Sequence, residues 1–255
     1  MTLTFLGTGT SQGVPVITCG CKVCRSSDTH NRRLRTSALL STAGGRNILF
    51  DIGPDFRQQM LRADVGRLDA VLVTHAHRDH VAGLDDIRPF NYVQRGAIDI
   101  YGNDVALHAL RRDYGYIFGR HDYPGLPEAE LHDVGRAESF TAAGELVTPI
   151  HVMHKDLPIL GYRIGKMAYI TDANYIPPSE MEKLKGLDVL VLNALRLQHH
   201  WSHYSLAEAL EVIDTLRPQR AYLTHVSHEL GLHDEVQASL PEGVSLAYDG
   251  LAVEV

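Results

Sequence analysis

The sequence feature that most constrains this chain is a cluster of metal-binding side chains at residues 74–80, which read THAHRDH. The cluster follows the apolar run 70–73 and places three imidazoles and one carboxylate within six residues. A tetrahedral catalytic ion takes three protein ligands and keeps its fourth position open, so four ligands are more than one such ion uses. Histidines two residues apart at a strand end direct both rings into one pocket. We therefore expect two metal ions bound side by side, as in hydrolytic two-metal sites. A histidine-rich surface loop is the alternative.

Length and composition favour one enzyme-sized domain. A chain of 255 residues with 44% hydrophobic content can bury a full core, and no Pro/Gly linker or low-complexity tract divides it, so we expect a single domain over 1–255. The net charge of −7 argues against a broad nucleic-acid-binding face. No apolar run approaches the ~18 residues needed to span a membrane. The start shows no basic segment followed by an apolar one, so we expect a cytoplasmic protein.

Short β-rich runs alternate with helical patterns along the chain, which indicates sheets covered by helices on their outer faces. The expected strands are 3–6, 37–41, 47–52, 70–74, 98–101, 162–164, 168–171, 189–192, 221–224 and 244–247. The expected helices are 56–63, 105–112, 179–185 and 206–216. Ser205 and Glu208 form a capping-box pattern for the last helix.

Further polar residues stand where expected strands stop. His154, Asp172 and His225 each follow an apolar or β-rich run, as His75 does. Judged singly, each is equally well explained as a structural residue. Taken together, His154 fits an ion held by the first two histidines of the cluster, and His225 fits a second ion held by Asp79 and His80. A carboxylate such as Asp172 is able to bridge two ions about 3.5–4 Å apart.

Three cysteines form a C-x-C-x-x-C knuckle at Cys19, Cys21 and Cys24. Clustered thiols in a reducing compartment more often hold metal than form disulfides. A structural zinc site is tetrahedral, so a fourth ligand is needed, and His228 is the best candidate. The alternative is three buried or redox-active thiols.

The motifs appear in the order and spacing of a known superfamily. FDIG at 50–53, the 75–80 cluster, His154, Thr171-Asp172 and Thr224-His225 resemble the metallo-β-lactamase superfamily. This resemblance implies an α/β fold, an αβ/βα sandwich of two mixed sheets with helices on the outer faces. It implies one ion on His75, His77 and His154, a second on Asp79, His80 and His225, and Asp172 as the bridge. It also implies that Asp51 orients the ligand loop.

A narrower resemblance is to the PhnP family of cyclic-phosphate phosphodiesterases. It is carried by GTGTSQGVP at 7–15, by the knuckle at 19–24 and by THVSH at 224–228. It implies a small or cyclic phosphodiester substrate, such as a ribosyl 1,2-cyclic phosphate, and a structural zinc on Cys19, Cys21, Cys24 and His228. It also implies a possible homodimer. An aspartate at 172, where true β-lactamases usually have cysteine, favours the phosphoesterase branches.

Two active-site divalent ions, zinc or manganese, would activate a bridging water for attack on phosphorus. The leaving alkoxide then needs a proton, and His203 is the expected acid because residues 203–205 resemble the family's catalytic histidine motif. Asp79 is also expected to be catalytic, because it is an expected ligand of the second ion. The alternative for His203 is an exposed histidine-rich loop, and His199 and His200 are less favoured.

Several alternatives stay open at this point. The nearest enzyme rival is a nuclease of the tRNA 3′-end-processing type, and a thioesterase is a weaker one. A non-hydrolytic metal-binding or carrier protein, like PqqB, belongs to a different class, but its ligand cluster is degenerate where this one is intact. The aromatic segment 114–128 is a lid, a dimer contact or an ordinary connecting loop.

Overall fold

The computed structural model describes residues 1–119 and 125–255, and two seven-stranded sheets dominate it. The first sheet has the order β14-β1-β2-β3-β4-β5-β6 and the second β13-β12-β11-β10-β9-β8-β7. The first sheet's strands are β1 (Thr2–Gly7), β2 (Ser37–Ser41), β3 (Asn47–Phe50), β4 (Ala70–Leu72), β5 (Ile98–Gly102), β6 (Ala129–Asp133) and β14 (Ala252–Glu254). The second sheet's strands are β7 (Phe140–Ala142), β8 (Glu145–His154), β9 (Leu157–Ile164), β10 (Met167–Ile170), β11 (Val189–Asn193), β12 (Arg220–Thr224) and β13 (Val244–Leu246).

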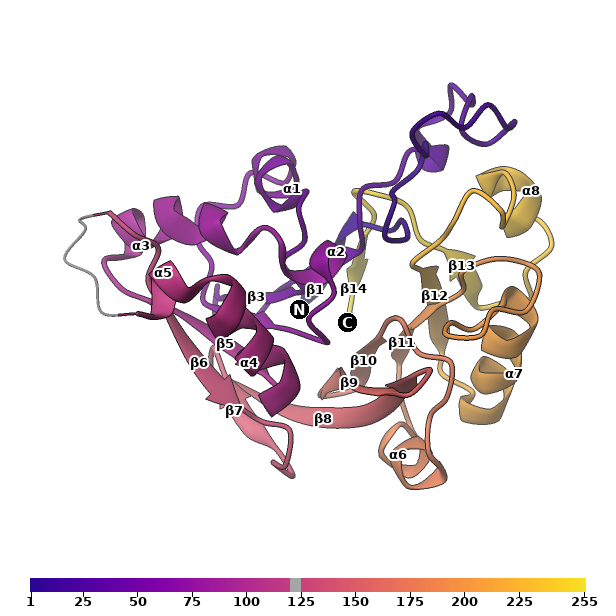
Figure 1. Ribbon diagram of the computed structural model, residues 1–255. Helices are drawn as coiled ribbons and strands as arrows, with labels where there is room; N and C mark the ends of the chain where they lie inside the picture. The colour runs from indigo at the N-terminus through magenta and orange to yellow at the C-terminus, as the bar shows by residue number, and fades with distance from the viewer. Residues whose placement is uncertain (120–124) are drawn as a thin grey trace.

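Helices cover the outer face of each sheet (Figure 1). The first half of the chain contributes α1 (Phe56–Arg62), α2 (Arg78–Val81), α3 (Arg88–Gln94), α4 (Asp104–Asp113) and α5 (Gly115–Phe118). The second half contributes α6 (Pro178–Lys183), α7 (Leu206–Leu216) and α8 (His233–Gln237). Single-turn 3₁₀ segments lie at Thr29–Asn31 and Leu84–Ile87.

The alternation of side chains along the strands builds the layers. In β11, Val189 and Val191 enter the core between the sheets, whereas Leu190 and Leu192 pack beneath the outer helices. Phe50 of β3 stacks on Tyr169 of β10, with ring centres 4.6 Å apart, and so joins the two sheets at the middle. The result is the four-layer αβ/βα sandwich expected from the sequence.

Parallel strand pairing brings the functional residues to one edge. Strands β3 to β6 are mutually parallel, and so are β10 to β13. Because the carboxyl ends of parallel strands meet at one edge, the residues that follow β3, β4, β10 and β12 lie near one another. The sheets are also tied at this edge, since Leu160 N donates to Thr74 O at 3.0 Å and the Tyr162 hydroxyl donates to Val73 O at 2.6 Å.

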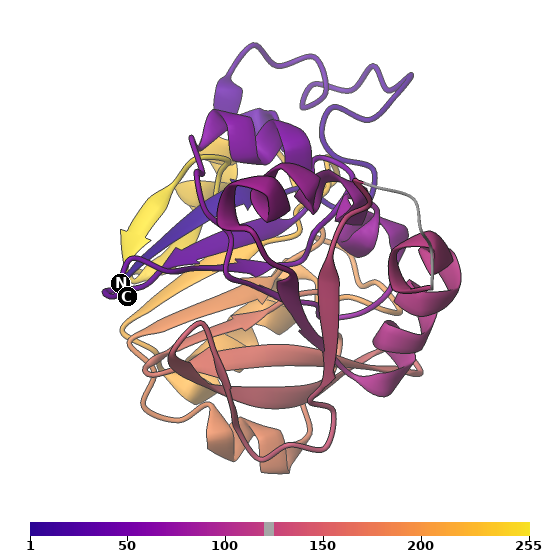
Figure 2. The same cartoon turned by 90° about the vertical axis from the view of Figure 1, so that its left-hand side faces the viewer.

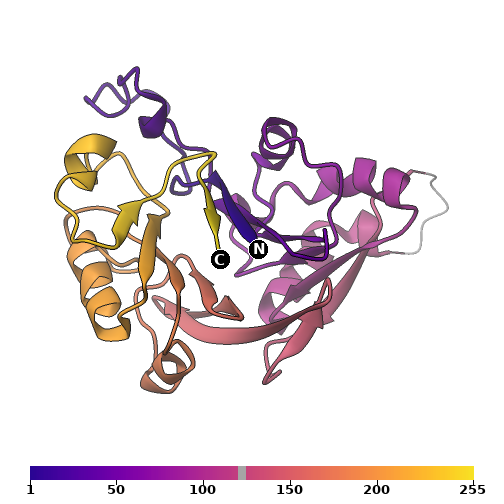
Figure 3. The same cartoon turned by 180° about the vertical axis from the view of Figure 1, so that it is seen from behind.

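The two ends of the chain lie side by side, because β1 pairs with β14 and Thr2 stands opposite Glu254 (Figure 2). The segment between β1 and β2 leaves the sheet and runs next to α8 (Figure 3). Lys22 of this segment forms an ion pair of 2.7 Å with Glu235 of α8. Among the described residues, no helix is both long and apolar enough to cross a membrane.

All ten expected strands and all four expected helices are present; most ends shift by one or two residues, but the strand expected at 162–164 begins five residues earlier, as β9. Strands β6, β7, β8 and β14 were not predicted, although β8 is ten residues long. Its Pro149, His151 and His154 break the alternating pattern that identifies a strand. The capping box is confirmed, because the Ser205 hydroxyl accepts from Glu208 N and the Glu208 carboxylate accepts from Ser205 N. Within the aromatic segment 114–128, α5 is helical, and residues 120–124 lie outside the described residues.

Gly53 is predicted to be essential for the ligand loop. A Cβ at this position would lie 2.1 Å from the backbone oxygen of Asp79, so the loop would have to move. We expect Gly53→Ala to lower the free energy of unfolding by about 1–3 kcal/mol, measured by urea denaturation. At the exposed Gly66, an added Cβ would meet no described atom within 4 Å, so Gly66→Ala is the control. Equal midpoints for the two variants would contradict the prediction.

Candidate metal centre

Three imidazoles converge to form the first ligand cluster, which consists of His75, His77 and His154. His75 Nε2 and His77 Nδ1 are 2.9 Å apart. His154 stands at the end of β8, and its Nδ1 lies 2.7 Å from the backbone oxygen of Asp172 and 2.9 Å from that of Ser202. Those carbonyls fix the ring as an Nδ1–H donor, which leaves Nε2 free to bind a cation.

The second ligand cluster consists of Asp79, His80, Asp172 and His225, with ligand atoms within 4.8 Å of one another. His80 Nε2 lies 3.2 Å from Asp79 Oδ2 and 3.4 Å from Asp172 Oδ1. His225 Nδ1 lies 3.0 Å from the same oxygen of Asp172. This cluster is richer in oxygen than the first, so manganese as well as zinc suits it.

Asp172 lies between the two clusters. Its Oδ1 faces His80 and His225, whereas its Oδ2 lies 3.9 Å from His75 Nε2. Each carboxylate oxygen therefore faces a different cluster. A carboxylate in this position is suited to bridge two cations.

Asp51 orients the loop that carries the first histidines. It is fully buried, and its carboxylate accepts hydrogen bonds from the Thr74 backbone N–H at 2.8 Å and from the Thr74 hydroxyl at 2.9 Å. Its Oδ2 also lies 2.7 Å from His80 Nδ1. Because Nδ1 of His80 is engaged there, Nε2 points toward the second cluster.

Three of these side chains follow their strands in a left-handed backbone conformation. Asp51, Asp172 and His225 have φ values of 59°, 60° and 55°. Non-glycine residues adopt this region uncommonly, and each such residue costs of order 1–3 kcal/mol unless its surroundings hold it. The sequence offers no signal for this geometry, which turns each side chain from the sheet toward the shared edge.

The protonation of His75 and Asp172 suits cations. Burial lowers the pKa of His75 well below its usual value, so its ring is neutral and available as a ligand. Burial would raise the pKa of Asp172, but His225 and His80 hold it well below the usual range. The buried Nε2 of His80 has no hydrogen-bond partner in the described part of the chain. A buried nitrogen that lacks a hydrogen-bond partner and faces carboxylates is suited to bind a divalent cation. The donor atoms of the two clusters therefore fit two metal ions.

His203 lies next to both clusters. Its ring centre is 4.7 Å from that of His154 and 5.0 Å from that of His225, and its Nδ1 lies 3.9 Å from Asp172 Oδ2. Nδ1 is buried and has no hydrogen-bond partner among the described residues. The side chain is 11% exposed, which differs from the exposed loop considered as the alternative. His199, by contrast, is exposed and pairs with Glu208.

The cysteine knuckle and His228 form a third cluster, which shares no residue with the first two. Cys21 Sγ and Cys19 Sγ lie 3.3 and 3.6 Å from His228 Nδ1, and Cys24 Sγ belongs to the same group. None of the three cysteines forms a disulfide. The Cys24 backbone N–H is the main cause that lowers the pKa of Cys21 to about 6, whereas burial raises that of Cys24 to about 11. Three sulfurs and one imidazole nitrogen are the donor set of structural zinc.

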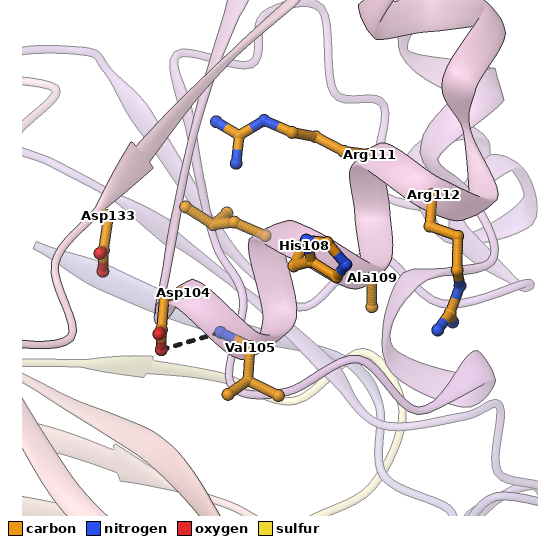
Figure 4. Close-up of a pocket in the computed structure, with 8 residues that line it drawn as sticks. Asp104, Val105, His108, Ala109, Arg111, Arg112 and Asp133 are labelled. Carbon is orange, nitrogen blue, oxygen red and sulfur yellow. Dashed lines mark hydrogen bonds between the residues drawn. The ribbon is translucent and has the colours of Figure 1, made fainter.

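A surface hollow of about 570 Å³ lies apart from these clusters, along α4 (Figure 4). Its lining includes Asp104, His108, Arg111, Arg112 and Asp133. None of these residues belongs to the three clusters, so the candidate site is defined by its ligands at the sheet edge rather than by this hollow.

Sequence reasoning missed a side chain that fixes the backbone next to Asp172. Asn193 ends β11, and its amide both donates to the backbone oxygen of Ala173 at 3.0 Å and accepts from its N–H at 2.8 Å. Ala173 directly follows Asp172. A polar residue at the end of an apolar strand is the only signal in the sequence, and it is shared by many structural asparagines.

Comparison with known proteins agrees with this geometry. The family model described as "Beta-lactamase superfamily domain" matches residues 46–226. A crystal structure described as a new diphosphatase from the PhnP family superimposes with a TM-score of 0.92 at 41% identity, covering 100% of this chain and 97% of that one. Ribonuclease Z of Mycobacterium marinum is 30% identical over 176 residues, which cover 62% of this chain and 63% of that protein.

The chain belongs to the metallo-β-lactamase superfamily, and within it the chain is PhnP-like. The ligand clusters at the sheet edge and the knuckle are compatible with the divalent-metal binding that this superfamily implies. Octanoyltransferase of Porphyromonas gingivalis is 43% identical over 248 residues, covering 97% of this chain. That match covers 50% of the relative, so the chain spans about half its length.

Metal analysis tests the three clusters separately. We expect the zinc-reconstituted protein to retain three ions per chain, one for the knuckle and two at the sheet edge. Cys24→Ser removes a sulfur ligand, so it should lose one ion and keep two, measured by elemental analysis after gel filtration. Lys22→Ser changes a knuckle residue whose described ion pair is with the exposed Glu235, and it should keep three. If the unchanged protein retains only two ions and all three thiols react with an alkylating agent, the prediction of a metal site at the knuckle is wrong.

Proposed function

We propose that this chain is a metal-dependent phosphodiesterase that hydrolyses a small or cyclic phosphodiester, such as a ribosyl 1,2-cyclic phosphate. The observation that carries the proposal is the carboxylate of Asp172 between two ligand clusters, with Nδ1 of His203 3.9 Å from its Oδ2. We assign one ion to His75, His77 and His154, a second to Asp79, His80 and His225, and both to Asp172. The proposed active-site ions are zinc or manganese, with a structural zinc on the knuckle.

Bound divalent cations would supply the hydrolytic nucleophile at neutral pH and neutralise charge on the phosphoryl oxygens. The chain's own residues set the geometry around them. Asp51 and the carbonyl partners of His154 fix the rings, so little reorganisation is needed when a substrate binds. His203 faces the phosphoryl position from beside Asp172, where it is placed to give a proton to the departing oxygen.

The protonation of His203 depends on the substrate. Burial is the main cause that lowers the pKa of His203 to about 3; the imidazoles of His225 and His154 contribute, and the charge of Asp172 opposes the shift. A phosphodiester anion beside the ring adds negative charge and raises the pKa again. His203 is therefore best suited to carry a proton while the substrate is bound.

Hydrolysis of a diphosphate is the second candidate. The observation that favours it is the 41% identity with a PhnP-family structure described as a diphosphatase. The two reactions differ in their leaving groups: a phosphodiester releases an alkoxide, which needs a proton, whereas a diphosphate releases a phosphate, which is stable as an anion. The role of His203 consequently separates the two candidates.

Three other functions are weaker. The match to ribonuclease Z covers 62% of this chain, and the net charge of −7 does not favour a polynucleotide partner. Thioester hydrolysis has no feature of the described site in its favour. A carrier protein does not need His203 buried next to a complete ligand set. We propose one domain over 1–255, acting in the cytoplasm on a small molecule, with a homodimer as the proposed assembly.

A substrate panel tests the proposed class. With the zinc- or manganese-reconstituted protein, we expect turnover of cyclic phosphodiesters, measured by ³¹P NMR. Dinucleotide diphosphates, precursor tRNA and thioesters form the other arms. Preferred cleavage of the diphosphate would favour the second candidate, and no phosphodiester turnover after reconstitution would contradict the leading one.

Replacement of His203 tests the proposed acid. We expect His203→Ala to lower kcat for alkyl phosphodiesters by about 10²- to 10⁴-fold, because the alkoxide departs without a proton. The loss should be much smaller for bis(p-nitrophenyl) phosphate, whose leaving group needs none. Metal content should stay unchanged, and His199→Ala, an exposed neighbour, is the matched control. Equal losses for both substrates would contradict the acid role.

A further inference from the structure

The chain's single tryptophan is exposed at the edge of the candidate site. Trp201 stands two residues before His203, and 60% of its surface is exposed. It belongs to none of the three hydrophobic cores that the described residues form. An indole left in water beside a catalytic centre contributes little to folding, so a ligand is the natural partner for its surface.

Lys155 holds its ammonium group near the same ring. The residue directly follows His154 in the turn between β8 and β9, where its backbone is left-handed with φ 55°. Its Nζ lies 4.7 Å from the centre of the Trp201 ring, within the range of a cation–π contact. Among the described residues, its anionic neighbour is the exposed Asp156, at 3.8 Å. The Lys155 ammonium is therefore able to pair with a further anion, such as a phosphate.

Asn174 fixes the spacing of these two residues. Its Oδ1 accepts from the Lys155 backbone N–H at 2.7 Å, and its Nδ2 donates to the Trp201 backbone oxygen at 3.3 Å. Asn174 is itself two residues after Asp172. One amide thus ties the turn after His154 and the loop before His203 to the segment that carries the proposed bridge.

A continuous row of rings joins Trp201 to the ligands. Trp201 stacks on His200 with ring centres 5.2 Å apart and an interplanar angle of 27°. His200 is 5.2 Å from His203, which is 4.7 Å from His154. Two imidazoles, those of His200 and His203, therefore lie between Trp201 and the ligand His154 in this row.

We propose that Trp201 and Lys155 determine specificity by binding a nucleobase-bearing phosphoester, with the base stacked on the indole and the ammonium paired with substrate phosphate. This inference rests on the proposed function, because it takes the phosphate to lie at the ligand clusters. The Lys155 side chain is 55% exposed, so it is free to leave the ring when a base arrives. Stacking of a base on an aromatic side chain tolerates any base, since every base has a π face.

Intrinsic fluorescence tests the proposal directly, because Trp201 is the only tryptophan in the chain. The zinc-reconstituted protein is titrated with AMP and, in parallel, with ribose 5-phosphate, which has the same sugar phosphate without the base. We expect AMP to quench the emission and to bind at least tenfold more tightly than ribose 5-phosphate. Equal binding of the two probes, or binding of AMP without a change in emission, would overturn the proposal.

Kinetics with two cyclic phosphodiesters give the second readout. The ratio of kcat/KM for 2′,3′-cyclic AMP to that for glycerol 1,2-cyclic phosphate should fall about tenfold in Trp201→Leu, mainly through KM. Lys155→Met should weaken AMP binding in the titration. Tyr92→Leu removes an aromatic residue of similar exposure from α3 and should leave the ratio unchanged. An unchanged ratio in Trp201→Leu would overturn the proposal. The AMP titration does not depend on turnover, so failure of the phosphodiesterase proposal is detected separately.

Discussion

The buried carboxylate of Asp51 is the interaction on which the site depends. It joins the end of β3 to the loop after β4, because it accepts from Thr74 and engages Nδ1 of His80. Burial raises the pKa of Asp51, which the hydrogen bonds from these partners oppose. Without it, the loop would lose the contact that keeps His80 Nε2 facing Asp172. The same loop leads into the ligand pair His75 and His77, so one buried group orients ligands of both clusters.

The proposed metal ions would couple folding to metal binding. Three carboxylates, those of Asp51, Asp79 and Asp172, surround His80 and raise its pKa well above the usual value, although burial opposes this. A proton on that ring occupies the nitrogen that a cation needs. Cation binding must therefore displace it, which makes affinity depend on pH. The cost of assembling buried carboxylates without cations is high, and the left-handed backbone of Asp172 and His225 adds to it.

Much of this site could be predicted from sequence, because its ligands follow apolar strands and cluster by spacing. His75, His80, Asp172 and His225 meet simply because parallel strands end at one edge. His154 was harder, since the strand that carries it contains proline and histidine and does not alternate. The left-handed backbone of three site residues and the role of Asn193 could not be predicted from the sequence, because both depend on contacts between distant segments. Trp201 is the clearest case of what sequence reasoning could not predict. The histidine-rich segment around it pointed to His203, but the contact between Lys155 and the indole ring is visible only in the fold.

The same fold supports many reactions, so the choice of substrate must come from residues around the ligands. Two segments next to the ligand loops are proposed to bind the substrate: the turn at Lys155 and the loop at Trp201. Both are bonded to Asn174, which follows the proposed bridging residue Asp172 by two positions. A ligand that moves these segments would also move Asp172, because only a short stretch of backbone lies between Asp172 and Asn174. Asn193 holds this stretch by its hydrogen bonds to Ala173. In the proposed function, recognition of the substrate and positioning of Asp172 would share this hydrogen-bonded segment, so binding energy away from phosphorus would help to align the reacting groups.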